Sequence, residues 1–318
     1  MSQTEENRGL NGANTISVAI ETEPSLPPSG IPSMIVDPEQ RMLHVLARDV
    51  YRGEGIIVDA GIFAGRSSEI LTKALRERAD SSKLASHRIK PVHSYDLGLC
   101  DGFMAGLLNE HYDAGLADGD SFLPILEKNL APFSDMLTFH PGDITTEEAP
   151  GDIEILFLDV CKTSAVNLHL MREFLPRLTV GGILIQQDFV HEWLPWIHVY
   201  MGLLDDYFEH IGTYGSSTVY RLVKPIAIDL SVDYYETLEI PAIDKLIAKA
   251  MKPLTDAQKY LVKFAQGRMY VDKGAKIDAR YIFEVLTTEY VTCAREIPHI
   301  PRPEHFQRYA DAVGKPLW

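Results

Sequence analysis

The chain has 318 residues, 46% of them hydrophobic and 24% charged, which is typical of a globular protein with one large domain or a domain and an appendage. Its net charge of −15 leaves no basic surplus to neutralise phosphates, so we expect neither nucleic acid nor an anionic membrane surface as a partner. The sequence contains no apolar run long enough to span a membrane.

The three cysteines, Cys100, Cys161 and Cys293, are too few for a disulfide framework and lack metal-binding spacing. Residues 1–20 are polar and have no apolar core, so we expect no signal peptide. Together these features predict a protein of the reducing cytoplasm.

Residues 1–33 are rich in Ser, Thr, Glu, Asn, Pro and Gly, which predicts a flexible N-terminal tail or lid arm. Asp37-Pro-Glu-Gln then begins a helix, with an N-cap and a proline in the first turn. Apolar residues recur along this helix at a spacing that should pack it on a sheet, namely Met42, Leu43, Leu46, Ala47 and Val50.

The stretch 55–68 combines a short apolar strand, a glycine turn and the start of a helix. Gly61 permits a tight turn and close approach of a ligand, and Gly65 permits close packing of the helix start. The spacing of these glycines matches neither the dinucleotide fingerprint nor the P-loop. Because Asp59 stands at the strand end, where a pyrophosphate would otherwise bind, the turn suits a cationic ligand better than an anionic one.

Four further strands are predicted in the next hundred or so residues, with helices or irregular loops between them. Residues 97–120 lack clear periodicity and predict an irregular, partly helical insertion. Each strand ends at or just before an aspartate: the strands are 90–96, 136–140, 153–159 and 183–188, and the aspartates are Asp96, Asp143, Asp159 and Asp188. Since ligands bind outside the carboxyl ends of parallel strands, these carboxylates and Asp59 should meet on one rim.

After Asp188 the pattern changes from alternating strands and helices to a hairpin. A helix over 195–207 precedes two strands, 208–214 and 217–223, joined by Gly215-Ser216. Residues 234–250, 255–267 and 278–295 then predict helices. The fold class expected is α/β: a Rossmann-like, doubly wound, mostly parallel sheet that ends in an antiparallel β-hairpin, with a helical C-terminal appendage. The expected divisions are a tail over 1–33, a sheet domain over 34–228 and the appendage over 229–318.

With its acidic strand ends, its Asp-Ala-Gly-x3-Gly turn and its terminal hairpin, the chain resembles class I S-adenosylmethionine-dependent methyltransferases over roughly residues 35–225. Within that superfamily, residues 157–162, Gly181-Gly182 and residues 185–189 resemble the macrocin-type sugar O-methyltransferases of antibiotic pathways. The resemblance implies methyl transfer from S-adenosylmethionine to a small molecule, with O-methylation in natural-product or sugar metabolism as the expected reaction.

The resemblance also assigns residues to the cofactor. Asp59 would meet the methionine ammonium directly or through water, and Ser67 or Ser68 its carboxylate. Asp96 would accept both ribose hydroxyls, and Asp143 the adenine amino group. The full set implied to bind the cofactor is Asp59, Ala60, Gly61, Phe63, Gly65, Ser67, Ser68, Asp96, Asp143 and Asp159.

The chain departs from the macrocin-type pattern at two positions that would contact a divalent metal. Cys161 stands in place of the second acid of an Asp-x-Asp, and Gln187-Asp188 stands in place of an Asp-Asp. Asp159, Gln187 and Asp188 remain candidates to hold Mg²⁺ through oxygen ligands, with fewer carboxylates than the family uses.

Without a metal, another group must take the acceptor's proton. His191 is the first candidate because histidine titrates near neutrality, although it could instead cap a helix or pack beneath Trp193. Asp188, Lys162 and Glu192 complete the candidates, and Lys162 could simply pair with a rim acid. For Cys161, packing is favoured over nucleophilic chemistry because a neighbouring carboxylate raises a thiol pKa.

Three classes of function are therefore open. The first is a methyltransferase, expected as a homodimer acting on a small-molecule acceptor. The second is a nucleotide-dependent enzyme on a similar sheet. The third is a non-catalytic partner subunit that keeps the fold; Cys161 and Gln187, which stand in place of acids, support this third class.

Overall fold

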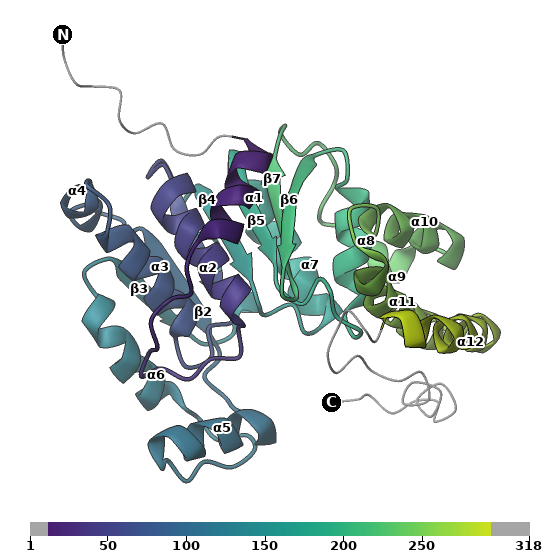
Figure 1. The fold of residues 1–318 in the computed structure, drawn as a ribbon, viewed down its shortest axis with the longest axis horizontal. Helices are drawn as coiled ribbons and strands as arrows, with labels where there is room; N and C mark the ends of the chain where they lie inside the picture. Colours follow the sequence, from purple (N-terminus) through teal and green to yellow (C-terminus); the bar gives the residue numbers. More distant parts are fainter. Residues whose placement is uncertain (1–11, 294–318) are drawn as a thin grey trace.

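The computed structural model describes residues 12–293, which form a seven-stranded sheet in the order β3-β2-β1-β4-β5-β7-β6 (Figure 1). The first five strands of this order are parallel, whereas β7 runs antiparallel to both β5 and β6. The strands are β1 (Ile56–Ala60), β2 (Val92–Asp96), β3 (Leu137–Pro141), β4 (Ile153–Leu158), β5 (Leu178–Gln186), β6 (Phe208–Tyr214) and β7 (Ser217–Leu222). The expected fold class is confirmed.

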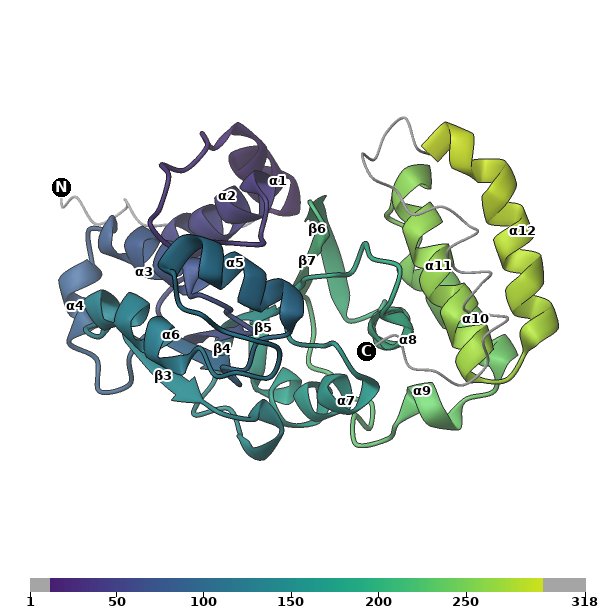
Figure 2. The ribbon, with the colours of Figure 1, turned by 90° about the horizontal axis from the view of Figure 1, so that it is seen from below.

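Helices cover both faces of the sheet, because the central strands are apolar on both sides. Ile57 and Phe157 pack on one face with α2 and α3, and Val58 and Leu158 pack on the other with α7 and α8 (Figure 2). The helices of the sheet domain are α2 (Asp37–Val45), α3 (Arg66–Arg76), α4 (Ser81–Ala85), α5 (Gly102–Tyr112), α6 (Leu123–Leu130), α7 (Ser164–Glu173) and α8 (Pro195–Leu203).

Strand β5 begins at Leu178, earlier than the sequence predicted. Helix α7 ends at Glu173, and Gly181 and Gly182 both lie inside the strand. Leu178 pairs with Ile153 and Ile183 with Ile155, so the residues between them form an irregular bulge. Gly181 has a φ of 86°, a value that favours glycine.

Within the segment 1–33, for which the sequence predicts a flexible tail, the described residues 12–33 include a helix packed on the sheet domain. Helix α1 (Ala13–Thr22) lies beside β6 and α2 (Figure 1). Ile16 and Ile20 are each only 1% exposed, and Tyr214 donates a hydrogen bond to Ser17 Oγ at 3.1 Å. Burial of these two apolar side chains stabilises the docking of α1, although the segment as a whole is polar in composition. Residues 1–11 lie outside the described residues.

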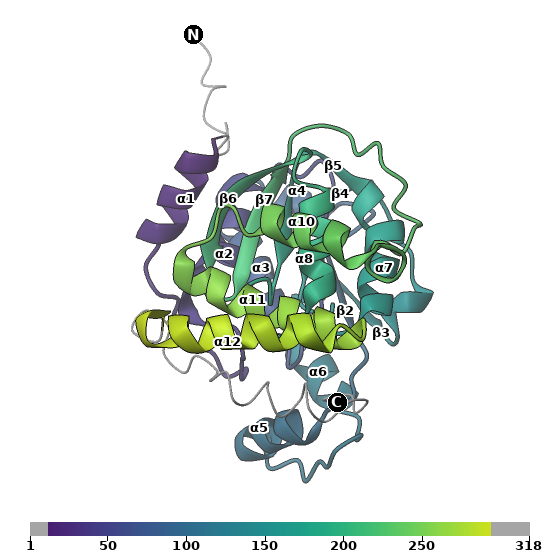
Figure 3. The ribbon, with the colours of Figure 1, turned by 90° about the vertical axis from the view of Figure 1, so that its right-hand side faces the viewer.

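The C-terminal segment forms four helices, as a layer beside the hairpin (Figure 3). They are α9 (Tyr234–Thr237), α10 (Ile240–Ala250), α11 (Asp256–Asp272) and α12 (Lys276–Cys293); residues 294–318 lie outside the described part of the chain. Leu184 of the sheet shares one continuous apolar core with Ile243 of α10 and Phe264 of α11. Within residues 12–293, no helix has both the length and the hydropathy of a membrane span.

Glu154 of β4 anchors the loop that leads into β1. Its carboxylate is 2% exposed and accepts hydrogen bonds from the backbone N–H groups of residues 52–55. We expect Glu154→Ala to lower the free energy of unfolding by about 3 kcal/mol, because these donors lose a charged acceptor. Urea unfolding measures this, and Glu148→Ala, at an exposed position, should change stability by less than about 0.5 kcal/mol. A loss of that small size in Glu154→Ala would contradict the assignment.

Candidate active site

The five predicted aspartates lie at one edge of the sheet. Strands β3, β2, β1, β4 and β5 are neighbours in that order and all parallel, so their carboxyl ends meet at the same edge. Asp59 lies near the end of β1, Asp96 ends β2, Asp159 directly follows β4, and Asp143 and Asp188 lie just beyond β3 and β5. The structure therefore brings these positions together, while their roles stay predictions.

The turn after β1 requires its glycines. Gly61 has a φ of 87°, and a Cβ there would lie 2.4 Å from the backbone oxygen of Asp159. Gly65 is the N-cap of α3 with a φ of 98°. Phe63 between them also has a positive φ, 49°, a conformation that a bulky side chain rarely adopts. Ala60, the last residue of β1, is fully buried.

Asp59 has one carboxylate oxygen that is hydrogen-bonded and one that is not. Oδ2 accepts hydrogen bonds from Ser67 Oγ at 2.9 Å and Ser68 Oγ at 2.7 Å. Oδ1 is buried and has no partner among the described residues. Burial raises the pKa of Asp59 to about 7, against the lowering effect of the two serines. The orphaned oxygen fits an ammonium or an ordered water as partner.

The two serines are engaged in a way that the sequence did not predict. Both hydroxyls donate to Asp59, and Ser68 Oγ also lies 2.8 Å from Ser94 Oγ. In this arrangement they orient the carboxylate of Asp59, and their hydroxyl protons are not directed at a methionine carboxylate.

The raised pKa of Asp59 predicts a specific loss of stability with pH. An acid whose pKa is higher in the folded than in the unfolded chain stabilises the fold while it is protonated. This contribution is fully present below the unfolded pKa, about 4, and is lost as the pH rises through the folded pKa. For a folded pKa of about 7, we expect Asp59 to cost roughly 2 to 3 kcal/mol of stability between pH 5 and 8. Unfolding by urea across this range should show that slope in wild type and not in Asp59→Asn; equal slopes would contradict it.

Asp96 holds the glycine turn. Its Oδ2 accepts hydrogen bonds from the backbone N–H groups of Ile62 and Phe63, both at 2.9 Å, and its Oδ1 from Gly98 at 2.7 Å. Burial raises the pKa of Asp96, and these hydrogen bonds oppose the rise. A carboxylate offers about four lone-pair positions, so roughly one remains for a ribose hydroxyl, where both hydroxyls were expected.

Asp143 is exposed at the edge beyond β3. Its Oδ1 accepts from the backbone N–H and the hydroxyl of Thr145, at 2.9 and 2.8 Å, and these bonds lower the pKa of Asp143. Asp143 is therefore an ionised acceptor fixed at the β3 end of the rim.

Lys162 lies between the two acids at the other end of the rim. Its Nζ donates to Asp159 Oδ1 at 2.8 Å and to Asp188 Oδ2. The Lys162 side chain is 50% exposed. Its partial desolvation alone would lower the pKa of Lys162, but the two carboxylates raise this pKa above the ordinary value, so the side chain is an ammonium at neutral pH. Burial also raises the pKa of Asp159, while Lys162 opposes that rise.

The residues proposed for a metal do not fit one in this arrangement. A divalent cation shared by Asp159 and Asp188 would have to displace the Lys162 ammonium that both already bind. The third candidate, Gln187, donates through Nε2 to Ser216 Oγ at 3.1 Å, and its Oε1 is buried without a partner. Residues 12–293 contain no cluster of three or more His, Cys, Asp or Glu side chains suited to a metal.

His191 lies in the loop between β5 and α8, with its side chain one-third exposed. Its Nδ1 is 3.5 Å from Glu192 Oε2, and no hydrogen bond to Asp188 is present. Asp188 itself has a φ of 60°, a strained conformation of the kind found at functional positions. Cys161 is buried, and burial raises the pKa of its thiol to about 12, in agreement with a packing role.

Glu39 of α2 is a site residue that sequence reasoning missed. It is 1% exposed and accepts hydrogen bonds from Ser216 Oγ at 3.0 Å and Ser217 Oγ at 2.8 Å, in the turn of the hairpin. Ser216 in turn accepts from Gln187, so Glu39 connects α2 to the end of β5. Burial raises the pKa of Glu39, with a smaller contribution from Asp188. Its only sequence signal, an acid in the first turn of a helix, is also that of an ordinary helix cap.

The segment between α1 and α2 covers the glycine turn. Arg66 of α3 donates to the Pro27 oxygen at 3.3 Å, and Ser29 donates to Glu69 at 2.5 Å. A cavity of about 20 Å³ remains between residues 32–35 and the turn, next to Asp159. Ligand pockets are usually at least roughly 300 Å³, so a ligand of nucleotide size could enter this cavity only if the covering segment moved.

No protein-family model matches the sequence, and no curated protein matches it. Solved structures do resemble it. The O-methyltransferase NovP is 18% identical, with 60% of this chain and 82% of its own covered and a TM-score of 0.45. A SAM-dependent O-methyltransferase from Thermotoga maritima is 16% identical, with 64% and 74% covered and a TM-score of 0.39. The SAH-bound methyltransferase PaMTH1 of Podospora anserina is 13% identical, with 69% and 91% covered and a TM-score of 0.38.

The resemblance to S-adenosylmethionine-dependent methyltransferases expected from the sequence is thus also found among solved structures. With TM-scores below 0.5, these similarities are likenesses only, and any functional conclusion depends on the chain's own residues.

Proposed function

We propose that the chain is an S-adenosylmethionine-dependent methyltransferase that methylates an oxygen of a small molecule, in natural-product or sugar metabolism. The observation that supports this most directly is the unpartnered, buried Oδ1 of Asp59, beside a glycine turn on a rim of carboxylates. Such a site attracts a cationic ligand that carries an ammonium group.

On the cofactor side, the residues would act as acceptors. Asp59 Oδ1 would take the ammonium of the methionine part, and Asp96 one ribose hydroxyl, while Asp143 would face the adenine amino group. The bound cofactor would supply an electrophilic methyl group on a cationic sulfur.

On the acceptor side, Lys162 would provide positive charge that Asp159 and Asp188 hold in place. A fixed ammonium stabilises the negative charge that develops on the acceptor oxygen as its proton leaves. His191 is proposed as the base that accepts this proton. Asp188, bound to Lys162, would orient the ammonium.

Calorimetry and a turnover assay test the proposal. S-adenosylmethionine should bind wild type, and Asp59→Ala should weaken binding at least about tenfold, since the ammonium loses a charge-assisted bond. NAD⁺ and ATP serve as controls for a nucleotide-dependent enzyme. Methyl transfer to hydroxylated acceptors should proceed equally with and without a chelator, because Lys162 occupies the position between the acids. Absence of S-adenosylmethionine binding would refute the proposal.

A non-catalytic partner subunit is the second candidate, favoured by the covering segment over the turn and its small remaining cavity. Cofactor binding without turnover on any acceptor would support it. The proposed location is the cytoplasm, in keeping with three buried free cysteines. A homodimer is proposed as well, and light scattering after size-exclusion chromatography tests it.

A further inference from the structure

Arg268 of α11 lies where the C-terminal helices meet the sheet domain, and it is only 8% exposed. Its Nη1 donates a hydrogen bond to the backbone oxygen of Trp193 at 2.6 Å. Its guanidinium carbon lies over the Trp196 ring, 5.3 Å from the centroid. Asp272, one turn along the same helix, is 3.5 Å from its Nε. A buried arginine in these contacts joins α11 to a segment outside the helical layer.

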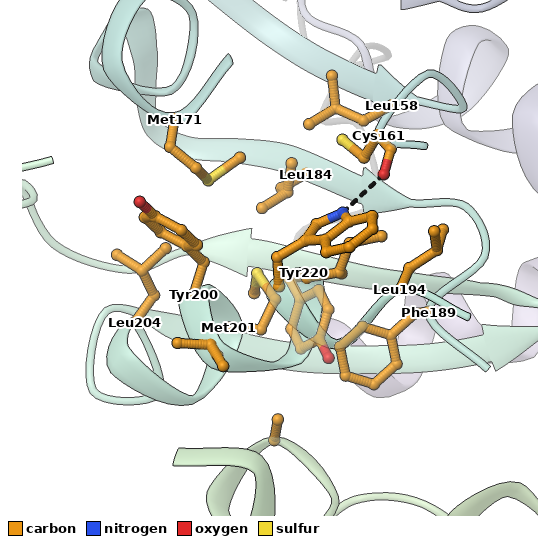
Figure 4. Close-up of a cluster of buried hydrophobic side chains, with 14 of the residues drawn as sticks. Leu158, Cys161, Met171, Leu184, Phe189, Leu194, Tyr200, Met201, Leu204 and Tyr220 are labelled. Atoms are coloured by element: carbon orange, nitrogen blue, oxygen red, sulfur yellow. Dashed lines mark hydrogen bonds between the residues drawn. The ribbon is translucent and has the colours of Figure 1, made fainter. Parts of the chain in front are cut away.

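The two tryptophans connect Arg268 to both acceptor-side loops of the rim. Trp193 lies in the loop that carries Asp188 and His191, between β5 and α8. Trp196, in the first turn of α8, donates from Nε1 to the backbone oxygen of Cys161 at 2.7 Å, the dashed line in Figure 4. Cys161 stands between Asp159 and Lys162 in the loop after β4.

The loop between β5 and α8 has little regular structure to hold it. Residues 187–194 form neither helix nor strand, and Asp188 has a positive φ. Backbone bonds from Gln187 to Leu158 and from Val190 to Ser216 hold the first part of the loop, at 3.1 and 3.0 Å, and His198 Nε2 lies 2.7 Å from the Phe189 oxygen. Towards the end of the loop, Arg268 holds Trp193. Because a planar guanidinium can donate in its plane while its face stacks on an aromatic ring, Arg268 makes both contacts from one rigid group.

We propose that Arg268 is a positioning residue. It holds the loop that carries Asp188 and His191 through Trp193, and the loop that carries Lys162 through Trp196. In this way the C-terminal helices fix the position of one loop relative to the other. The inference rests on the proposed function. In this role of Arg268, the helical appendage helps to align the groups on the acceptor side. Asp59 and the glycine turn, on the cofactor side, do not depend on Arg268.

Arg268→Met is the test for turnover, because it keeps an apolar stem under Trp196 and removes both polar contacts. We expect kcat to fall about 10- to 100-fold, as a small misplacement of reacting groups can cost this much. The dissociation constant of S-adenosylmethionine should stay within about twofold, and Arg268→Lys should recover part of kcat. Unchanged kcat, or a parallel loss of cofactor affinity, would overturn the inference.

Tryptophan accessibility gives a readout that needs no acceptor. In a Trp318→Phe background, Trp193 and Trp196 are the only tryptophans of the chain. Acrylamide quenching of their fluorescence should rise at least about twofold in Arg268→Met, since the loop loses its bond to α11. Absence of methyl transfer by wild type would refute the proposed function. Unchanged quenching in Arg268→Met would overturn the positioning role of Arg268, whether or not the wild type transfers a methyl group.

Lys263→Met is the matched control. Lys263 is on the same helix and pairs with Glu289 of α12 at 2.8 Å, away from both tryptophans. It should change neither kcat nor quenching. Should Arg268→Met fail to fold, Trp196→Phe replaces it: this variant keeps a ring beneath the guanidinium and removes the donor to Cys161. The same loss of kcat at unchanged cofactor affinity is then expected, and wild-type kcat would overturn the inference.

Discussion

Lys162→Met is expected to reduce methyl transfer by about 10²- to 10³-fold, the range seen when one fixed donor to a developing oxyanion is removed. Methionine has nearly the length of lysine and no charge, so the change removes the ammonium shared by Asp159 and Asp188 with little loss of volume. Cofactor affinity should change by less than about twofold, because the Asp59 side of the rim is untouched. Steady-state kinetics and calorimetry separate the two effects.

The same variant should respond to Mg²⁺ where wild type does not. Without Lys162, the carboxylates of Asp159 and Asp188 lose the ammonium that both bind, and hard cations prefer such oxygen ligands. Millimolar Mg²⁺ should therefore raise the melting temperature of Lys162→Met only. Lys252→Met, which removes an exposed pair with Asp205, is the control and should behave as wild type in both assays. Full activity in Lys162→Met would contradict the assigned role.

Gly202→Ala should destabilise the chain by about 3 kcal/mol, at the upper end of the usual cost of overpacking. Gly202 lies in α8 where α10 crosses it, and an added Cβ would lie 1.9 Å from the backbone oxygen of Leu246. No side-chain rotation relieves a contact with backbone, so α10 would have to move as a unit. Urea unfolding measures the loss.

The matched control for this change is Gly106→Ala in α5. A Cβ at Gly106 meets nothing within 4 Å, so only helix propensity changes, and we expect a gain of about 0.5 to 1 kcal/mol. A Gly202→Ala variant as stable as wild type would show that α8 and α10 are not held at the spacing described.

The sheet and its acidic rim could be predicted because central parallel strands are buried on both faces and so appear as uninterrupted apolar runs. Residues 155–158, followed by Asp159, are such a run. The start of β5 could not be predicted, since Gly181-Gly182 looks like a helix end and occurs here in a bulge. Helix α1 was missed because only Ile16 and Ile20 mark its buried face, while Val18 between them is exposed, and this gives too weak a period.

Within the site, residue types were easier to predict than their partners. The positions of Asp59 and Asp96 followed from strand ends, but the backbone donors that occupy Asp96 come from the turn folding back on it. The bridge by Lys162 depends on the distance between the loops that follow β4 and β5, and the sequence alone does not give that distance. For the same reason Glu39 could not be distinguished from an ordinary helix cap.

The docking of α1 on β6 has a consequence for synthesis of the chain. Ser17 meets Tyr214 and Glu39 meets Ser217, partners separated by 197 and 178 residues. At about 5 to 20 residues per second, the ribosome adds the later partner roughly 10 to 40 s after the earlier one. During that interval Ile16 and Ile20 have no β6 to cover them, so nascent chains should expose an apolar N-terminal helix that chaperones can bind. Completion of the hairpin would end that exposure.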